Sequence, residues 1–171
     1  MRNCIWLSLF LLLGLVAATG QGQPAPGEVT LKTVKYSELG DMIRNLKGKV
    51  VVVDIWADWC TPCKREFPNL VKLQQKYAAQ GLVAVSVALD DPNNKLPQDA
   101  ALRFLKKQNA TLTNVFLDEK EEVWKSRFGI DGPPCVFVFN REGKYKKFDA
   151  DHIQEGYVNI EKRAVEFLQQ K

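Results

Sequence analysis

The sequence predicts a single α/β domain in which helices flank a central mixed β-sheet. Apolar, β-branched runs alternate with amphipathic segments along the chain, which is typical of strands alternating with helices. Two short runs separated by a turn near the carboxyl end predict a hairpin, whose antiparallel pairing makes the sheet mixed. The chain has 171 residues, of which 46% are hydrophobic, and this length suffices for one buried core.

The first 20 residues predict a secretory signal peptide that precedes this domain. Arg2 is followed by an apolar run from Ile5 to Val16 and then by small residues. The run is shorter than the roughly 20 residues of a membrane-spanning helix, so cleavage is favoured over retention as a membrane anchor. Residues 21–27 are rich in Gln, Gly and Pro and are expected to form a linker. The folded domain is then expected to span residues 28–171.

The first half of the domain alternates strands and helices. The helix expected at 37–46 has Leu39 and Ile43 on one face, and Gly48 ends it. The run at 50–56 is continuously apolar and β-branched except for one Asp, which is the pattern of a central strand buried on both faces. In chain order, the predicted strands are 31–35, 50–56, 82–89, 115–117, 135–139 and 145–148, and the predicted helices are 37–46, 63–79, 98–108, 119–128 and 157–169.

The second half follows the same pattern. Residues 82–89 are apolar and predict another buried strand, after which a polar loop leads to the helix at 98–108. Residues 129–134 are rich in Gly and Pro and are expected to form a loop. Asn140 to Gly143 predicts the hairpin turn, and the last helix has apolar residues such as Ile160 mostly on one face.

The charge balance argues against nucleic acid as a partner. The chain has 24 Lys and Arg against 20 Asp and Glu, which gives a net charge of +4. The basic residues are scattered along the chain, so they are expected to lie on solvated faces rather than to form one electrostatic patch.

The segment that carries chemistry is Cys60-Thr61-Pro62-Cys63, which follows the strand at 50–56 and opens the next helix. The first turn of a helix has unpaired N–H groups and the positive end of the peptide dipoles, so it stabilises a thiolate on Cys60. A thiolate is the nucleophile in disulfide exchange, and Cys63 can resolve the mixed disulfide that forms. Pro62 suits the first turn because an N–H there would have no helical partner.

Two other uses of these cysteines stay open at this point. A structural disulfide that closes so short a loop would stabilise the fold little. A metal-binding or metal-carrier protein is the main alternative, because Cys60, Cys63, Cys135 and His152 could together supply four ligands. Otherwise Cys135 is expected to be a buried small residue that opens a strand, with a third redox thiol as the alternative, and His152 is expected to be a surface residue.

The run from Val51 to Lys64, with its Trp-Cys-x-x-Cys motif, resembles the active-site segment of thioredoxins. Its continuation from Lys64 to Pro68 is more similar to the TlpA/ResA branch of exported thioredoxin-like proteins, and so are the extra helix and strand between Gln98 and Leu117. The resemblance covers nearly all of residues 28–171. It implies a thioredoxin-like fold with a helix–strand insertion.

The resemblance also implies roles for individual residues. Asp54 lies in an apolar strand, where burial should raise its pKa, and its family role would be proton transfer to or from Cys63. The alternative is a carboxylate at a strand end that accepts hydrogen bonds from loop N–H groups. The loop before Cys135 matches the family's Gly-x-Pro-x loop, which has a cis peptide bond before its second proline. The implied substrate-binding residues are Trp59, Thr61, Pro62, Pro133 and Pro134.

The sequence departs from the family pattern at three positions. Pro133 lacks the N–H that strand-like docking of a substrate normally uses, so only its carbonyl can take part. Cys135 replaces the Thr of many relatives and the acidic residue of the cytochrome-maturation relatives. Asp54 is thioredoxin-like, since many members of the TlpA/ResA branch have an uncharged residue there.

Together these features predict an exported thiol-disulfide oxidoreductase of the periplasm or extracytoplasmic space that reduces protein disulfides. The expected partners are protein or small-molecule disulfides and thiols. A redox partner must also reset the cysteine pair, and a membrane electron donor is expected for a reductant. No cofactor or metal is expected, and the protein is expected to be a monomer. A binding module with idle cysteines is a further hypothesis.

Overall fold

The computed structural model describes residues 27–154 and 156–170. The predicted signal peptide and all but the last residue of the predicted linker lie outside the described residues, as does the last residue of the chain. In chain order the elements are β1 (Lys32–Val34), α1 (Tyr36–Asn45), β2 (Val50–Trp56), α2 (Thr61–Tyr77), a 3-10 turn (Ala78–Gln80), β3 (Leu82–Ala88), α3 (Lys95–Lys107), β4 (Thr113–Leu117), α4 (Glu121–Phe128), β5 (Cys135–Phe139), β6 (Tyr145–Phe148), α5 (Ala150–Gln154) and α6 (Val158–Gln169).

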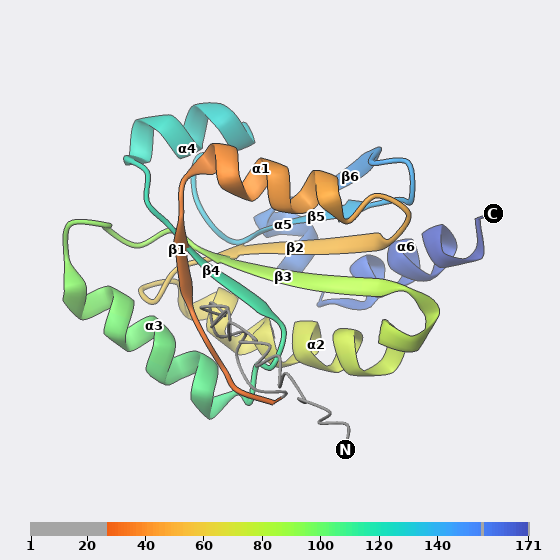
Figure 1. Ribbon diagram of the computed structural model, residues 1–171, viewed down its shortest axis with the longest axis horizontal. Coiled ribbons are helices and arrows are strands. Elements are labelled where there is room, and N and C mark those ends of the chain that lie inside the picture. Colours follow the sequence, from red (N-terminus) through yellow and green to blue (C-terminus); the bar gives the residue numbers. More distant parts are fainter. Residues whose placement is uncertain (1–26, 155, 171) are drawn as a thin grey trace, which may run out of the picture.

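The strands form one sheet in the order β1-β4-β3-β2-β5-β6 (Figure 1). The first four in that order run parallel, whereas β5 is antiparallel to β2 and β6 is antiparallel to β5. The sheet is therefore mixed, as the sequence predicts, with the hairpin at one edge. β2 lies inside the sheet and all seven of its residues are buried, which agrees with its nearly continuous apolar run.

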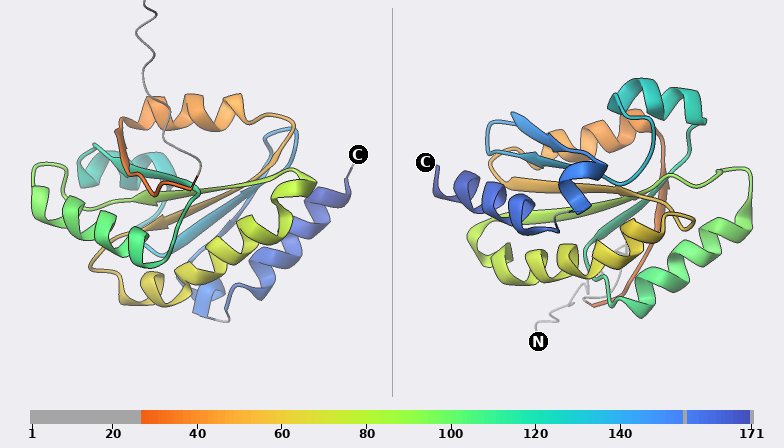
Figure 2. Two further views of the ribbon diagram at one scale, coloured as in Figure 1. Left: turned by 60° about the horizontal axis from the view of Figure 1, so that its bottom comes forward. Right: turned by 180° about the vertical axis from the view of Figure 1, so that it is seen from behind.

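Helices cover both faces of this sheet: α1 and α4 lie on one face, and α2, α3 and α6 lie on the other (Figure 2). Side chains of a strand point alternately to the two faces, so β2 contributes to two cores. Val52 and Trp56 pack in the core that includes α2 and α6, here called the α2 face. Val53 and Ile55 pack in the core that includes α1 and α4, here called the α1 face.

Two helices begin earlier than predicted, each with a side chain that caps its first turn. α2 begins at Thr61, two residues early, because the sulfur of Cys60 accepts the N–H of Cys63 and Cys60 is the N-cap. α3 begins at Lys95 because the side chain of Asn94 accepts the N–H of Leu96. The sequence pattern did not predict α5, whose five residues are too few to show a helical period.

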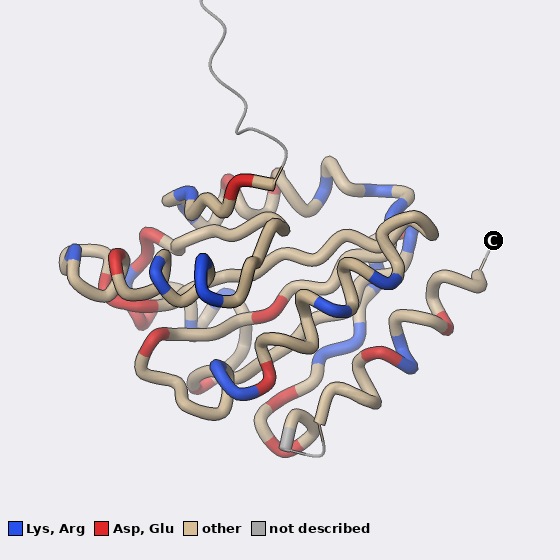
Figure 3. Tube along the Cα trace, turned by 90° about the horizontal axis from the view of Figure 1, so that it is seen from below, with Lys and Arg blue, Asp and Glu red and all other residues tan. Residues whose placement is uncertain are grey.

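The described surface carries charges of both signs. Acidic and basic residues are interspersed over its helices and loops (Figure 3), and several form ion pairs, such as Lys76 with Glu161 at 2.7 Å. This distribution agrees with the expectation of solvated charged faces. Of the described helices, none combines the length and apolar character that crossing a membrane requires.

Candidate active site

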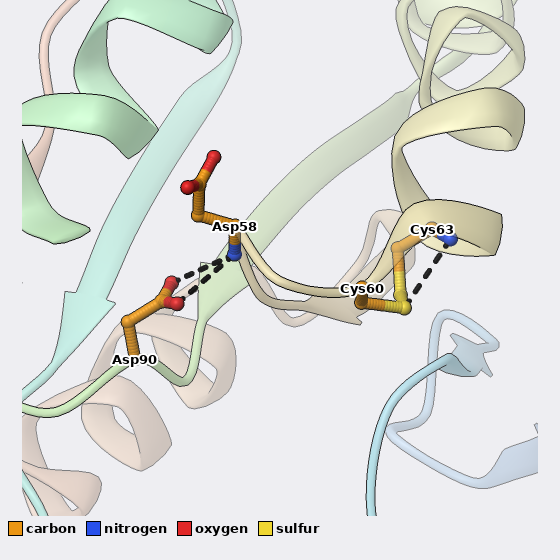
Figure 4. The surroundings of a disulfide bond; sticks show 4 residues. All are labelled: Asp58, Cys60, Cys63 and Asp90. Carbon is orange, nitrogen blue, oxygen red and sulfur yellow. Dashed lines mark hydrogen bonds between the residues drawn. A yellow bond between two sulfur atoms is a disulfide. The ribbon is translucent and has the colours of Figure 1, made fainter.

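The start of α2 brings the two cysteines of the Cys-x-x-Cys segment together. Cys60 and Cys63 form a disulfide with a Cα–Cα distance of 5.3 Å, and each residue is 3% exposed. The N–H of Cys63 donates a hydrogen bond to the sulfur of Cys60 at 3.3 Å (Figure 4). A donor at a helix N-terminus stabilises negative charge, so in the reduced state this N–H favours a thiolate on Cys60.

A buried carboxylate holds the loop that leads from β2 to Cys60. Both oxygens of Asp90 lie 3.0 Å from the N–H of Asp58, which donates to them (Figure 4). Asp90 follows β3 and is 3% exposed, and burial is the main cause that raises its pKa. Sequence reasoning placed Asp90 in a polar loop only. The sequence signal that could have indicated this role is its position just after β3, the strand that pairs with β2 and so ends near the cysteines.

Asp54 lies inside β2 on the α2 face, between Val52 and Trp56 of that face. It is 5% exposed, and burial raises its pKa to about 7, opposed by a hydrogen bond of 2.7 Å from the hydroxyl of Tyr157. The expected burial and raised pKa are therefore confirmed, and the hydrogen-bond donor is a side chain rather than a loop N–H. Sequence reasoning missed Tyr157 because 103 residues separate it from Asp54.

Residues implied in substrate binding lie at one end of the sheet. Trp59 is 64% exposed beside Cys60, Thr61 is exposed and Pro62 is half-buried. The peptide bond between Pro133 and Pro134 is cis, as the resemblance implies. Cys135 comes next and pairs with Ile55 near the end of β2, so register places this loop at the same end as the start of α2.

Two aromatic residues of the motif have different surroundings. Trp56 is fully buried and packs against Phe67 and Phe104, with ring centroids 5.4 and 5.1 Å away. Trp59, three residues later, is mostly exposed. Trp56 therefore belongs to the core, whereas Trp59 presents its ring to solvent beside Cys60.

The third cysteine and the histidine do not join the pair. Cys135 is 1% exposed and packs on the α1 face, whereas Cys60 and Cys63 pack on the α2 face. His152 is exposed and its Nδ1 lies 2.6 Å from an oxygen of Asp149. Among residues 27–154 and 156–170, no three His, Cys, Asp or Glu residues gather in a way that could hold a metal ion. Among the described residues, these four side chains thus do not form one four-ligand site.

Comparisons with known proteins agree with this geometry. The model of the AhpC/TSA family matches residues 22–148. Thioredoxin-like protein YneN of Bacillus subtilis (strain 168) is 34% identical over 154 residues, which cover 81% of this chain and 85% of that protein. Thiol-disulfide oxidoreductase ResA of the same organism is 31% identical over 140 residues, covering 81% of this chain and 72% of that protein.

A solved structure extends the comparison to the fold. The crystal structure of a thiol:disulfide interchange protein of the thioredoxin family from Chlorobium tepidum TLS has a TM-score of 0.55 and 25% identity, covering 71% of this chain and 83% of that chain. The fold, the Cys60–Cys63 pair and the similarity to these proteins together show that the chain is a thiol-disulfide oxidoreductase of thioredoxin-like fold. The chain belongs to the AhpC/TSA family and, within it, resembles the ResA-type oxidoreductases.

Proposed function

We propose that this chain reduces disulfide bonds of proteins outside the cytoplasm, with Cys60 as the nucleophile and Cys63 as the resolving thiol. The observation that carries the proposal is the position of Cys60 at the N-cap of α2, where the Cys63 N–H reaches its sulfur at 3.3 Å and the two residues form a disulfide. The helix N-terminus makes Cys60 the better thiolate of the pair.

The cycle needs no atoms beyond the two thiols and the substrate disulfide. The Cys60 thiolate attacks one sulfur of the substrate, and the other substrate sulfur leaves as a thiolate that takes up a proton. Cys63 then loses its proton and attacks the Cys60 sulfur, which forms the Cys60–Cys63 disulfide and releases the second substrate sulfur as a thiolate that takes up a proton. Two electrons pass from the cysteine pair to the substrate.

Asp54 is proposed to accept the proton of Cys63 in the second step. Both side chains belong to the α2 face, and both are buried away from bulk water. A pKa of about 7 lets the carboxyl group take and release a proton near neutral pH, whereas an ordinary Asp would remain ionised there.

We propose the reducing direction because few groups add to the stabilisation that the helix N-terminus gives the Cys60 thiolate. Strongly oxidising cysteine pairs depend on a strongly stabilised reduced form. Within the described residues the Cys60 sulfur has the Cys63 N–H as its hydrogen-bond donor, and Pro62 has no N–H to add. The nearby cation Lys64 is engaged with Asp58 at 3.1 Å, which leaves it less able to stabilise a thiolate.

The substrate is proposed to dock as an extended segment between Trp59 and the loop of Pro133 and Pro134. The exposed ring of Trp59 offers apolar contact next to the reacting sulfur. Pro133 can offer its carbonyl to a strand-like substrate but has no N–H to donate. Thr61 and Pro62 complete the surface around the sulfur of Cys60.

Export and a redox partner complete the proposal. The apolar amino-terminal run predicts a signal peptide, and a compartment outside the cytoplasm would oxidise the dithiol. A donor must therefore return electrons to the pair after each cycle, and a membrane electron donor would deliver them from the cytoplasm. The chain is proposed to act as a monomer.

Reduction of insulin by dithiothreitol tests the proposal. The full chain is expected to accelerate precipitation of the reduced insulin chains, and Cys60→Ser is expected to bring the rate to the uncatalysed background. Cys63→Ser keeps the nucleophile but cannot resolve, so the reduced variant, mixed with insulin after dithiothreitol is removed, is expected to accumulate a mixed disulfide. Equal rates for wild type and Cys60→Ser, or one tightly bound metal ion per wild-type chain, would contradict the proposal.

A further inference from the structure

The partner of the buried Asp54 carboxylate comes from the far end of the chain. The Tyr157 hydroxyl donates to the carboxylate at 2.7 Å, and the two residues are 6% and 5% exposed. Tyr157 immediately precedes α6, and its carbonyl accepts the N–H of Glu161 at 2.9 Å. Ile160 and Ala164 of that helix are fully buried, so packing of α6 fixes the tyrosine backbone beside the sheet.

The strands next to Asp54 do not offer it a charged partner. Ser86 of β3 pairs with Asp54 in the sheet, but its hydroxyl donates to the side-chain oxygen of Asn114 at 2.8 Å. Val136 of β5 pairs with Asp54 on the other side and is apolar. Within the described residues, the hydroxyl of Tyr157 is thus the side chain that donates a hydrogen bond to the Asp54 carboxylate.

We propose that Tyr157 is a positioning residue for disulfide exchange, whose hydroxyl holds the Asp54 carboxylate on the α2 face in the ionised form that can accept the Cys63 proton. The proposal rests on the proposed role of Asp54. A buried carboxylate without a donor strongly favours its neutral form, and a neutral carboxyl group cannot act as a base. The hydroxyl offsets part of that penalty without bringing a charge into the core.

The surroundings of the pair leave Tyr157 a donor throughout the cycle. Burial and the charge of Asp54 raise the Tyr157 pKa well above its ordinary value, so the hydroxyl keeps its proton. Within the described residues, Glu66 of α2 also acts on Tyr157, and the charge of Asp54 acts in turn on Cys135 of β5. Cys135 packs on the opposite face of the sheet.

Tyr157→Phe tests the proposal because it removes one oxygen and keeps the ring. Tyr77→Phe is a matched control, since the Tyr77 hydroxyl also donates to a carboxylate at 2.7 Å, that of Glu161, away from the cysteines. The first readout is the ¹³C shift of the Asp54 carboxyl carbon against pH in the oxidised full chain. Loss of a hydrogen bond to a charged group is expected to move its titration about one to two pH units upward in Tyr157→Phe.

The second readout is the release of the second substrate thiol in a single turnover of the reduced chain with insulin. The rate should rise with pH as Asp54 ionises, and Tyr157→Phe should shift this rise upward and slow the reaction about fivefold or more at pH 7. Tyr77→Phe should match wild type in both readouts. An Asp54 titration that is unchanged in folded Tyr157→Phe overturns the proposal.

Asp54→Asn separates this proposal from the one on which it rests. If Asp54→Asn keeps the wild-type rate profile, Asp54 is not the proton acceptor and the proposed function fails in that part. If Asp54→Asn removes the pH-dependent rise but Tyr157→Phe resembles wild type, the role of Tyr157 alone is wrong. If the proposal holds, adding Tyr157→Phe to Asp54→Asn has no further effect on the rate.

Discussion

The two faces of the sheet share the same strands but bury different chemistry. The α2 face holds the disulfide together with Asp54 and its partner Tyr157. The α1 face buries aliphatic and aromatic side chains and one thiol, Cys135. Burial raises the Cys135 pKa to about 12, whereas Cys60 lies at a helix N-terminus with an N–H on its sulfur. The same residue type therefore lies in two environments, of which the helix N-terminus favours a thiolate and burial on the α1 face disfavours one.

The difference between the faces has an energetic reason. An apolar face stabilises the fold by removing surface from water, at about 25 cal/mol per Å². A buried carboxyl group works against that gain, because its charged form is disfavoured away from water. Burying Asp54 therefore makes the α2 face less stabilising, and the same carboxyl group can exchange a proton near neutral pH. The α1 face has no such buried carboxyl group among its described core residues. Substitutions on the two faces should differ accordingly.

The largest expected effect is on stability, from Asp54→Asn. With a folded pKa of about 7 against an ordinary value of 3.8, native Asp54 binds more protons than unfolded Asp54 between these pH values. The unfolding free energy of wild type should then fall as pH rises from about 4 to about 7, by up to about 4 kcal/mol. Asn stays neutral and can still accept the Tyr157 hydrogen bond, so the variant should lose this decline and be the more stable protein at pH 8.

Urea unfolding of the oxidised chain at pH 4, 6 and 8 measures this difference. Asp41→Asn is the control, because Asp41 is exposed on α1 and pairs with Arg44 at the surface. The control should follow the wild-type pH dependence, since surface ion pairs contribute little. Equal pH dependence of wild type and Asp54→Asn would show that Asp54 does not titrate as a buried group, and the contrast between the faces would lose its main support.

A smaller effect is expected from Asp90→Ala. This substitution tests the loop that leads from β2 to Cys60. The Asp90 carboxylate accepts the Asp58 N–H with both oxygens, and its removal leaves that N–H without this acceptor. The expected cost is about 1–3 kcal/mol of unfolding free energy, with slower insulin reduction because Cys60 is held less firmly. Unchanged stability and unchanged rate together would show that the loop is held by other contacts.

Sequence patterns predicted most of the fold because its signals are local. The apolar run at 50–56 identifies the central strand, and the Cys-x-x-Cys spacing at its end identifies the redox pair. The hydrogen bond between Tyr157 and Asp54 joins residues 103 positions apart, so no local pattern contains it. The face on which Cys135 lies depends on the register of β5 against β2, and a shift of one residue would reverse it.

The smallest expected effect comes from Cys135→Ala on the α1 face. Replacing a buried thiol by a methyl group leaves a small cavity, and the expected cost is about 1 kcal/mol of unfolding free energy. Insulin reduction should match wild type, because the thiol lies on the opposite face from the disulfide and its pKa of about 12 keeps it protonated.

The same burial should protect Cys135 from a maleimide in the folded oxidised chain, with labelling appearing only on unfolding. Rapid labelling of the folded chain, or a large loss of reductase activity in Cys135→Ala, would mean that the third thiol takes part in exchange and that the division of chemistry between the faces is wrong.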